Sequence, residues 1–149
     1  MPIRERKKHS PSEFDLDVIS GDDDMFRWFL LCFLFGKPIR SETAVATWRI
    51  FIDGKVDTPW AILETPNHKL VNMLRSGGYT RYQHAAADGL QKCMKQLIRD
   101  YDGSLYLMVE SSMDEDELSK RIQKLYGVGP KIAEIFMREV DEIFARRVE

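Results

Sequence analysis

The segment from Leu118 to Val140 constrains the fold more than any other part of the chain. It consists of two amphipathic stretches joined by a short turn with the sequence Leu-Tyr-Gly-Val-Gly-Pro-Lys, residues 125–131. Two glycines on either side of one apolar residue let the backbone turn tightly while Val128 fills the helix crossing. Pro130 favours the first position of a helix, and apolar residues continue at helical spacing from there to the C-terminus. We therefore expect a hairpin of two packed helices over about residues 114–147, the second helix being continuous.

The rest of the chain has the same helical pattern, because apolar residues recur at spacings of three and four. Helix-start residues such as Ser41 and Asp114 and helix-stop residues such as Gly36 and Gly77 divide this pattern into segments. The predicted helices span residues 25–35, 42–53, 59–63, 66–76, 80–101 and 115–125, and the last begins at residue 130. No stretch shows the alternation of a strand. The sequence predicts an all-α fold of about seven helices.

The length of 149 residues suits one domain. Residues 1–24 mix charges with Ser and Pro, and we expect a mobile N-terminal tail there, with local order around Phe14 to Ile19. Residues 25–149 are then predicted to form a single helical domain that contains the hairpin.

Composition excludes several classes of protein. The longest apolar run, Trp28 to Phe35, has eight residues, whereas a membrane-spanning helix needs about 20. The basic first residues lack the apolar core of a secretory signal, so we expect no membrane partner and an intracellular location, either cytoplasm and nucleoid or nucleus. Cys32 and Cys93 stand alone in apolar helical patterns and are predicted to be buried thiols.

The charge distribution points to a local basic surface. The net charge is only −2, but acidic residues dominate in residues 1–24, and basic residues outnumber acidic ones in residues 37–103 and 118–149. The second hairpin helix begins with unpaired amides, and such amides together with the helix dipole bind phosphate without reading base sequence. Tyr79 and Tyr82 are near in sequence to cations that either flank one DNA-facing edge together or are simply scattered surface charges. These cations are Lys37, Arg40, Arg75, Arg81 and Lys131.

The hairpin residues resemble a helix-hairpin-helix motif. The longer stretch from Phe26 to Val140 resembles the six-helix domain of the helix-hairpin-helix DNA glycosylases, the endonuclease III superfamily of base excision repair. Three further features support this resemblance: the loop Gly36-Lys37-Pro38, the Gly78-Tyr79 turn before the longest helix, and the Tyr101-Asp102-Gly103 end of that helix.

The resemblance implies a DNA-binding surface built around the hairpin. The amides matching Gly127, Gly129 and Ile132 would bind a phosphate of double-stranded DNA, with Val128 in the turn. Lys37 and Arg40 would contact the DNA from the loop that begins at Gly36. In the family, backbone carbonyls matching Gln123, Leu125 and Val128 often hold a metal ion, so the resemblance implies a hairpin-bound metal as the candidate cofactor.

The resemblance also assigns a candidate catalytic residue. Bifunctional members carry a lysine at the position of Lys131, and this lysine attacks the sugar C1′ and forms a Schiff base. A lysine at a helix start can equally serve as a phosphate contact or as a solvated charge. The catalytic aspartate of the family has no clear counterpart, because Glu149 stands at the matching offset. Asp141 would lie about 15 Å along a continuous helix from Lys131, and Glu134 faces the wrong neighbourhood for that role.

Two hypotheses follow. The chain binds duplex DNA in the manner of a glycosylase, with abasic-site lyase or glycosylase activity as a further candidate property. Alternatively, it is a catalytically inactive interaction module, or a subunit whose protein partner or second copy supplies the domain that this chain lacks. The two cysteines cannot supply the four thiolates of the iron–sulfur cluster that some family members hold, so no such cluster is expected.

Overall fold

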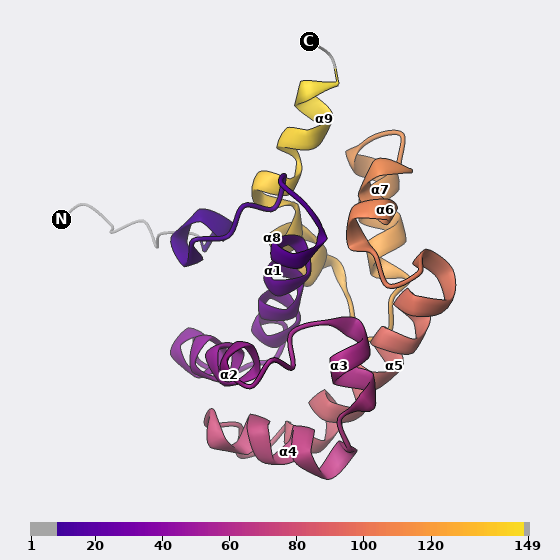
Figure 1. Cartoon of the computed structure of the whole chain (residues 1–149). Helices are drawn as coiled ribbons and strands as arrows, with labels where there is room; N and C mark the ends of the chain where they lie inside the picture. Colours follow the sequence, from indigo (N-terminus) through magenta and orange to yellow (C-terminus); the bar gives the residue numbers. More distant parts are fainter. Residues whose placement is uncertain (1–8, 148–149) are drawn as a thin grey trace, which may run out of the picture.

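A computed structural model describes residues 9–147 of the chain. Helices and turns, with no strand, make up this part (Figure 1). A short 3₁₀ helix, η1, spans Pro11–Phe14. The α-helices are α1 (Asp22–Phe35), α2 (Ser41–Asp53), α3 (Pro59–Glu64), α4 (Asn67–Ser76), α5 (Gln83–Tyr101), α6 (Leu105–Glu110), α7 (Glu115–Gln123), α8 (Pro130–Val140) and α9 (Glu142–Arg146). The prediction of an all-α fold is confirmed.

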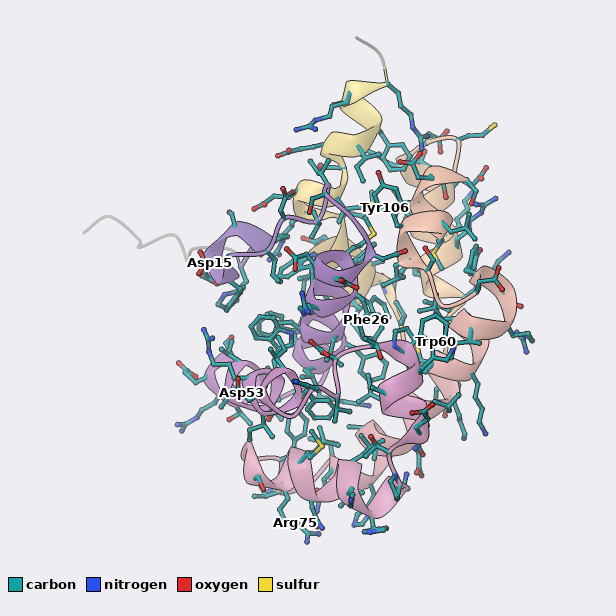
Figure 2. All side chains as sticks on the ribbon, in the orientation of Figure 1. Asp15, Phe26, Asp53, Trp60, Arg75 and Tyr106 are labelled. Atoms are coloured by element: carbon teal, nitrogen blue, oxygen red, sulfur yellow. The ribbon has the colours of Figure 1, made fainter. Side chains whose placement is uncertain are left out.

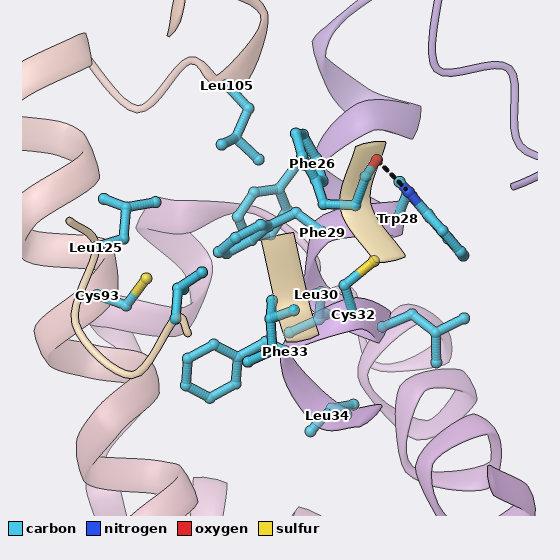
Figure 3. Packing of buried hydrophobic residues seen from close by; sticks show 14 of the residues in the cluster. Phe26, Trp28, Phe29, Leu30, Cys32, Phe33, Leu34, Cys93, Leu105 and Leu125 are labelled. Atoms are coloured by element: carbon cyan, nitrogen blue, oxygen red, sulfur yellow. Dashed lines mark hydrogen bonds between the residues drawn. The ribbon is translucent and has the colours of Figure 1, made fainter. Parts of the chain in front are cut away.

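Helix α1 forms the centre of the core. Three aspartates begin it, where negative charge stabilises the helix dipole, and from Met25 to Phe35 only Arg27 is not buried. A helix that is apolar on all sides must be surrounded by other elements, and α1 contacts α2, α6 and α8. Figure 3 shows its side chains reaching toward Cys93 on α5, Leu105 on α6 and Leu125 before the hairpin turn.

Two buried indole groups connect α1 to its neighbours. Trp28 is fully buried, and its Nε1 donates to the carbonyl oxygen of Phe136 on α8 at 3.0 Å (Figure 3). On α2, the Nε1 of Trp48 donates to the carbonyl oxygen of Arg27 at 2.8 Å. Because a buried indole N–H needs a partner, these bonds fix α2 and α8 against α1.

The N-terminal segment differs from the tail that the sequence predicts. Leu16 and Val18 are buried in the core, and Phe14 packs edge-on against Trp48 with ring centroids 5.5 Å apart. Helix α1 begins at Asp22, three residues before the predicted start. Residues 9–24 therefore pack on the helical domain, because their apolar side chains cover α1 and α2; residues 1–8 lie outside the described range.

Helix α6 is absent from the predicted set. It has six residues, too few to give a clear period. The hydroxyl of Ser104 accepts a hydrogen bond from the Leu107 amide and donates to the carboxylate of Asp22, which also accepts from the Tyr106 amide. A residue more than 80 positions away therefore helps to start this helix.

The prediction of a continuous C-terminal helix is wrong. Arg138 (ψ 124°) and Glu139 (φ 66°) leave the helical region inside α8, so the regular helix breaks after Met137, before α9 begins. The N-terminal segment bonds to both residues: Arg138 donates to the His9 carbonyl at 2.8 Å, and the Ser12 hydroxyl donates to the Glu139 carboxylate at 2.8 Å. These tertiary bonds hold a break that the apolar pattern alone does not show.

Both cysteines are buried, as predicted. Burial raises the pKa of Cys93 to about 12 and raises the pKa of Cys32 well above its usual value. Both thiols therefore stay protonated at neutral pH and are poor nucleophiles. None of the described helices has the length and apolarity needed to span a bilayer.

Candidate nucleic-acid interface

The predicted hairpin is formed by α7 and α8, which pack against each other. The side chain of Asp114 caps α7 by accepting from the Glu117 amide at 2.9 Å. In the turn, the Val128 amide donates to the Leu125 carbonyl at 3.1 Å, and the Val128 side chain is buried. Gly127 adopts a left-handed conformation with a φ of 79°, which only glycine adopts readily. The tight turn with a buried valine is therefore present.

The N-terminus of α8 lacks a side-chain cap. Gly129 is the N-cap residue, Pro130 holds the first position, and no side chain among residues 9–147 accepts from the first-turn amides. The amides of Gly127 and Gly129 likewise have no acceptor in the described part of the chain. Gly127 is exposed, so the turn presents unpaired donors at the positive end of α8, which is regular up to Met137. Such an end is suited to an anion.

The C-terminal end of α1 packs against this turn. A Cβ on Gly127 would lie 3.2 Å from the ring of Phe33, and a Cβ on Gly36 would come within 2.7 Å of the Ile132 side chain. The loop after α1 therefore contacts the first turn of α8 directly. The structure thus brings Lys37, in that loop, next to the segment that carries Gly127, Gly129 and Ile132.

The other predicted cations are more dispersed. Arg40 is the N-cap residue of α2, and Arg75 lies in the last turn of α4, where it extends outward (Figure 2). The turn after Arg75 packs on α2, since a Cβ on Gly78 would lie 3.1 Å from Thr43. The contact of Gly36 with Ile132 places the loop that carries Lys37 beside the hairpin, and Lys131 lies on the hairpin itself.

Tyr79 belongs to the core and not to a DNA-facing edge. Its side chain is fully buried, and its hydroxyl donates to the Leu34 carbonyl at 3.0 Å. Burial raises the pKa of this phenol well above its usual range. Tyr79 connects the turn before α5 to the end of α1 and therefore has a structural role.

Lys131 is exposed in the first turn of α8. Residues 9–147 place no carboxylate within ion-pair distance of its amine. Glu134 lies 3.9 Å from Arg138 instead. Asp141 follows the far end of α8, so at least about 9 Å of regular helix separates it from Lys131 despite the break. Glu149 lies outside the described residues.

The predicted metal site consists of backbone carbonyls in the turn. One of them, on Leu125, already accepts the Val128 amide, which leaves it one lone pair. The side chain of Gln123 bonds to Ser119 on its own helix. Residues 9–147 contain no cluster of three or more His, Cys, Asp or Glu side chains that could hold a metal ion. The carbonyl site at the hairpin stays a prediction.

Sequence reasoning missed one residue of this region. Gln96, on α5, bonds to the hairpin backbone at two places. Nothing in the sequence indicates this contact, because a glutamine on the polar face of a long helix is an ordinary surface residue.

Comparison with known proteins supports the helical architecture. No protein-family model matches the chain, and no curated protein matches it. A solved structure, a trapped endonuclease III–DNA covalent intermediate in an estranged-adenine complex, superposes with a TM-score of 0.55 at 22% sequence identity. The match covers 87% of this chain and 47% of that chain, so this chain spans about half the length of the solved protein. The likeness establishes that the chain shares its all-helical fold with about half of that endonuclease III structure.

Proposed function

We propose that the protein binds double-stranded DNA through backbone phosphates at the turn between α7 and α8. The observation that carries this proposal is the set of unpaired amides at Gly127, Gly129 and the uncapped start of α8. The solved protein of the same fold is a complex with DNA, which supports the choice of ligand. Phosphate contacts hold a duplex without reading its sequence.

The salt dependence of duplex binding tests this proposal. Counterion release makes the logarithm of the association constant fall linearly with the logarithm of salt concentration, by about 0.9 per phosphate neutralised. We expect a clearly negative slope that is the same for duplexes of unrelated sequence. A flat salt dependence, or no binding at low salt, would contradict phosphate contact. Lys37→Ala should reduce the magnitude of this slope by about 0.9, which is the contribution of one phosphate contact.

Lys131 gives the proposal a catalytic extension. The C1′ of an abasic site is an aldehyde, so an unprotonated amine can attack it and release water to form a Schiff base without a base-recognition pocket. Because Lys131 is exposed beside the unpaired amides, a phosphate held there would bring the neighbouring sugar toward its amine. Loss of a C2′ proton from the Schiff base would then expel the 3′ phosphate and cleave the strand, so this extension makes the protein an abasic-site lyase with no carboxylate of residues 9–147 within ion-pair distance of Lys131.

Borohydride trapping on a duplex with one abasic site tests the extension. We expect a covalent protein–DNA adduct with the wild-type chain and none with Lys131→Ala. Lys124→Ala is the matched control, because Lys124 is a second exposed lysine of the same hairpin and should leave the adduct intact. An adduct that survives Lys131→Ala would exclude this lysine as the nucleophile.

A second candidate function is a DNA-binding module without chemistry. The observation that favours it is the lack of a carboxylate near Lys131 among residues 9–147. Duplex binding without any trapped adduct would identify this function. A protein partner or a second copy of the chain would then have to supply any missing catalytic groups.

A further inference from the structure

The side chain of Gln96 bonds helix α5 to the backbone of the hairpin turn. Gln96 is half-buried on α5, and its Nε2 donates to the Lys124 carbonyl at 2.7 Å. Its Oε1 accepts from the Tyr126 amide at 2.8 Å. The orientation of the Gln96 amide follows from its partners, since a carbonyl can only accept and a backbone N–H can only donate. The nitrogen and the oxygen of the side-chain amide therefore both bond to the backbone of residues 124–126.

These two bonds lie immediately before the left-handed glycine. Lys124 and Tyr126 flank Leu125, whose side chain is buried, and Gly127 follows directly. With both sides of Leu125 bonded to α5, the peptide that leads into Gly127 has a fixed direction. The Tyr126 amide is also occupied, so the unpaired amides of the turn begin at Gly127.

The Tyr126 ring adds an apolar contact with the same helix. A Cβ on Gly89 would lie 3.7 Å from this ring, and the Lys92 ammonium lies 4.9 Å from the ring centroid. The ring is half-exposed and lies along α5. Gly89, Lys92 and Gln96 thus contact the turn from one face of α5.

We infer that Gln96 is a positioning residue for the phosphate-binding amides. It fixes the turn in the conformation that presents Gly127 and Gly129 before DNA arrives. Preorganisation of this kind raises affinity, because the turn loses less conformational freedom on binding. The inference rests on the proposed function and adds to it a residue that touches no DNA.

The chain offers a matched control on the same helix. Gln91 is also half-buried on α5 and also bonds through both ends, with its Nε2 donating to the Thr65 carbonyl at 2.9 Å and its Oε1 accepting from Asn67 at 3.2 Å. Thr65 follows α3 and Asn67 begins α4, so both partners lie in a different part of the chain from the hairpin turn. Gln91 and Gln96 thus share residue type, helix and bonding pattern, and they differ in which loop they hold.

The test replaces each glutamine by methionine, which keeps the length of the side chain and removes its hydrogen bonds. Gln96→Met should weaken duplex binding by about tenfold, as expected for two lost hydrogen bonds, and should speed hydrogen exchange of the Tyr126 amide. Gln91→Met should leave both quantities at their wild-type values. Thermal unfolding of each variant shows whether it remains folded at the assay temperature.

The outcomes separate the inference from the proposed function. If Gln96→Met binds duplex as tightly as the wild-type chain, or if both variants weaken binding equally, the positioning role is overturned and the proposed DNA binding still stands. Absence of binding by the wild-type chain would overturn the proposed function, and the positioning role with it.

Discussion

Gly129→Ala is expected to weaken duplex binding by about tenfold or more at a cost in folding stability of about 1 kcal/mol or less, because alanine is a poorer N-cap residue than glycine. Gly129 has a φ of −102°, which any residue adopts, and no atom lies within 4 Å of the position that a Cβ would take. The free protein therefore tolerates the methyl group. In the complex, the methyl group would occupy space that a phosphate needs to reach the amides, as glycine allows close approach at other phosphate-binding turns.

Gly127→Ala should differ from Gly129→Ala in its effect on folding stability. Its φ of 79° is strained for alanine by about 1–2 kcal/mol, and the new Cβ would lie 3.2 Å from Phe33. This variant should therefore lose stability as well as affinity. Of the two turn glycines only Gly127 has a φ that is strained for alanine, and that difference makes Gly129 the better probe. Isothermal titration with matched melting curves measures both quantities, and wild-type affinity in Gly129→Ala would show that no phosphate approaches the turn.

Gly77→Ala is expected to be among the most destabilising small substitutions in this chain. Its Cβ would lie 2.7 Å from the Cα of Thr47, a buried residue of α2 whose hydroxyl donates to the Thr43 carbonyl. Because the obstacle is backbone in the middle of a helix, neither partner can move aside cheaply. We expect a loss at the upper end of the range for overpacked cores, about 3 kcal/mol, measured by urea denaturation.

The control is the same substitution at Gly89. There a Cβ would lie 3.5 Å from Phe33 and 3.7 Å from Tyr126, which are ordinary contacts. Gly89 lies inside α5, where alanine is favoured over glycine by about 0.5–1 kcal/mol. Gly89→Ala should therefore stabilise the protein. A neutral Gly77→Ala would show that the turn after α4 does not pack on α2 as described.

Elements with local signals were predictable from the sequence. The start of α7 follows from Asp114, the turn from Gly127, and the start of α8 from Pro130, and each of these residues acts within a few positions of itself. Elements that depend on distant partners were not predictable. Helix α6 needs Asp22, and the break before α9 is held by the N-terminal segment.

The same distinction applies to the candidate site. The unpaired amides at the start of α8 follow from the local sequence, because helix starts leave donors unpaired, whereas the Gly127 amide was predicted from the resemblance. Tyr79 was misassigned because its burial under α1 depends on tertiary packing. Gln96 was missed because its bonds cross about 30 positions of sequence. The charge pattern predicted a basic surface, but only the fold shows that the loop carrying Lys37 lies next to the hairpin.

The most direct test of the account is an NMR titration of the ¹⁵N-labelled protein with a short undamaged duplex. If phosphates bind at the hairpin, the amides of Gly127, Gly129, Lys131 and Ile132 should show the largest shifts, and the Tyr126 amide, already bonded to Gln96, should move less. Shifts confined to other faces of the protein, or no shifts at a concentration that saturates binding, would contradict the account.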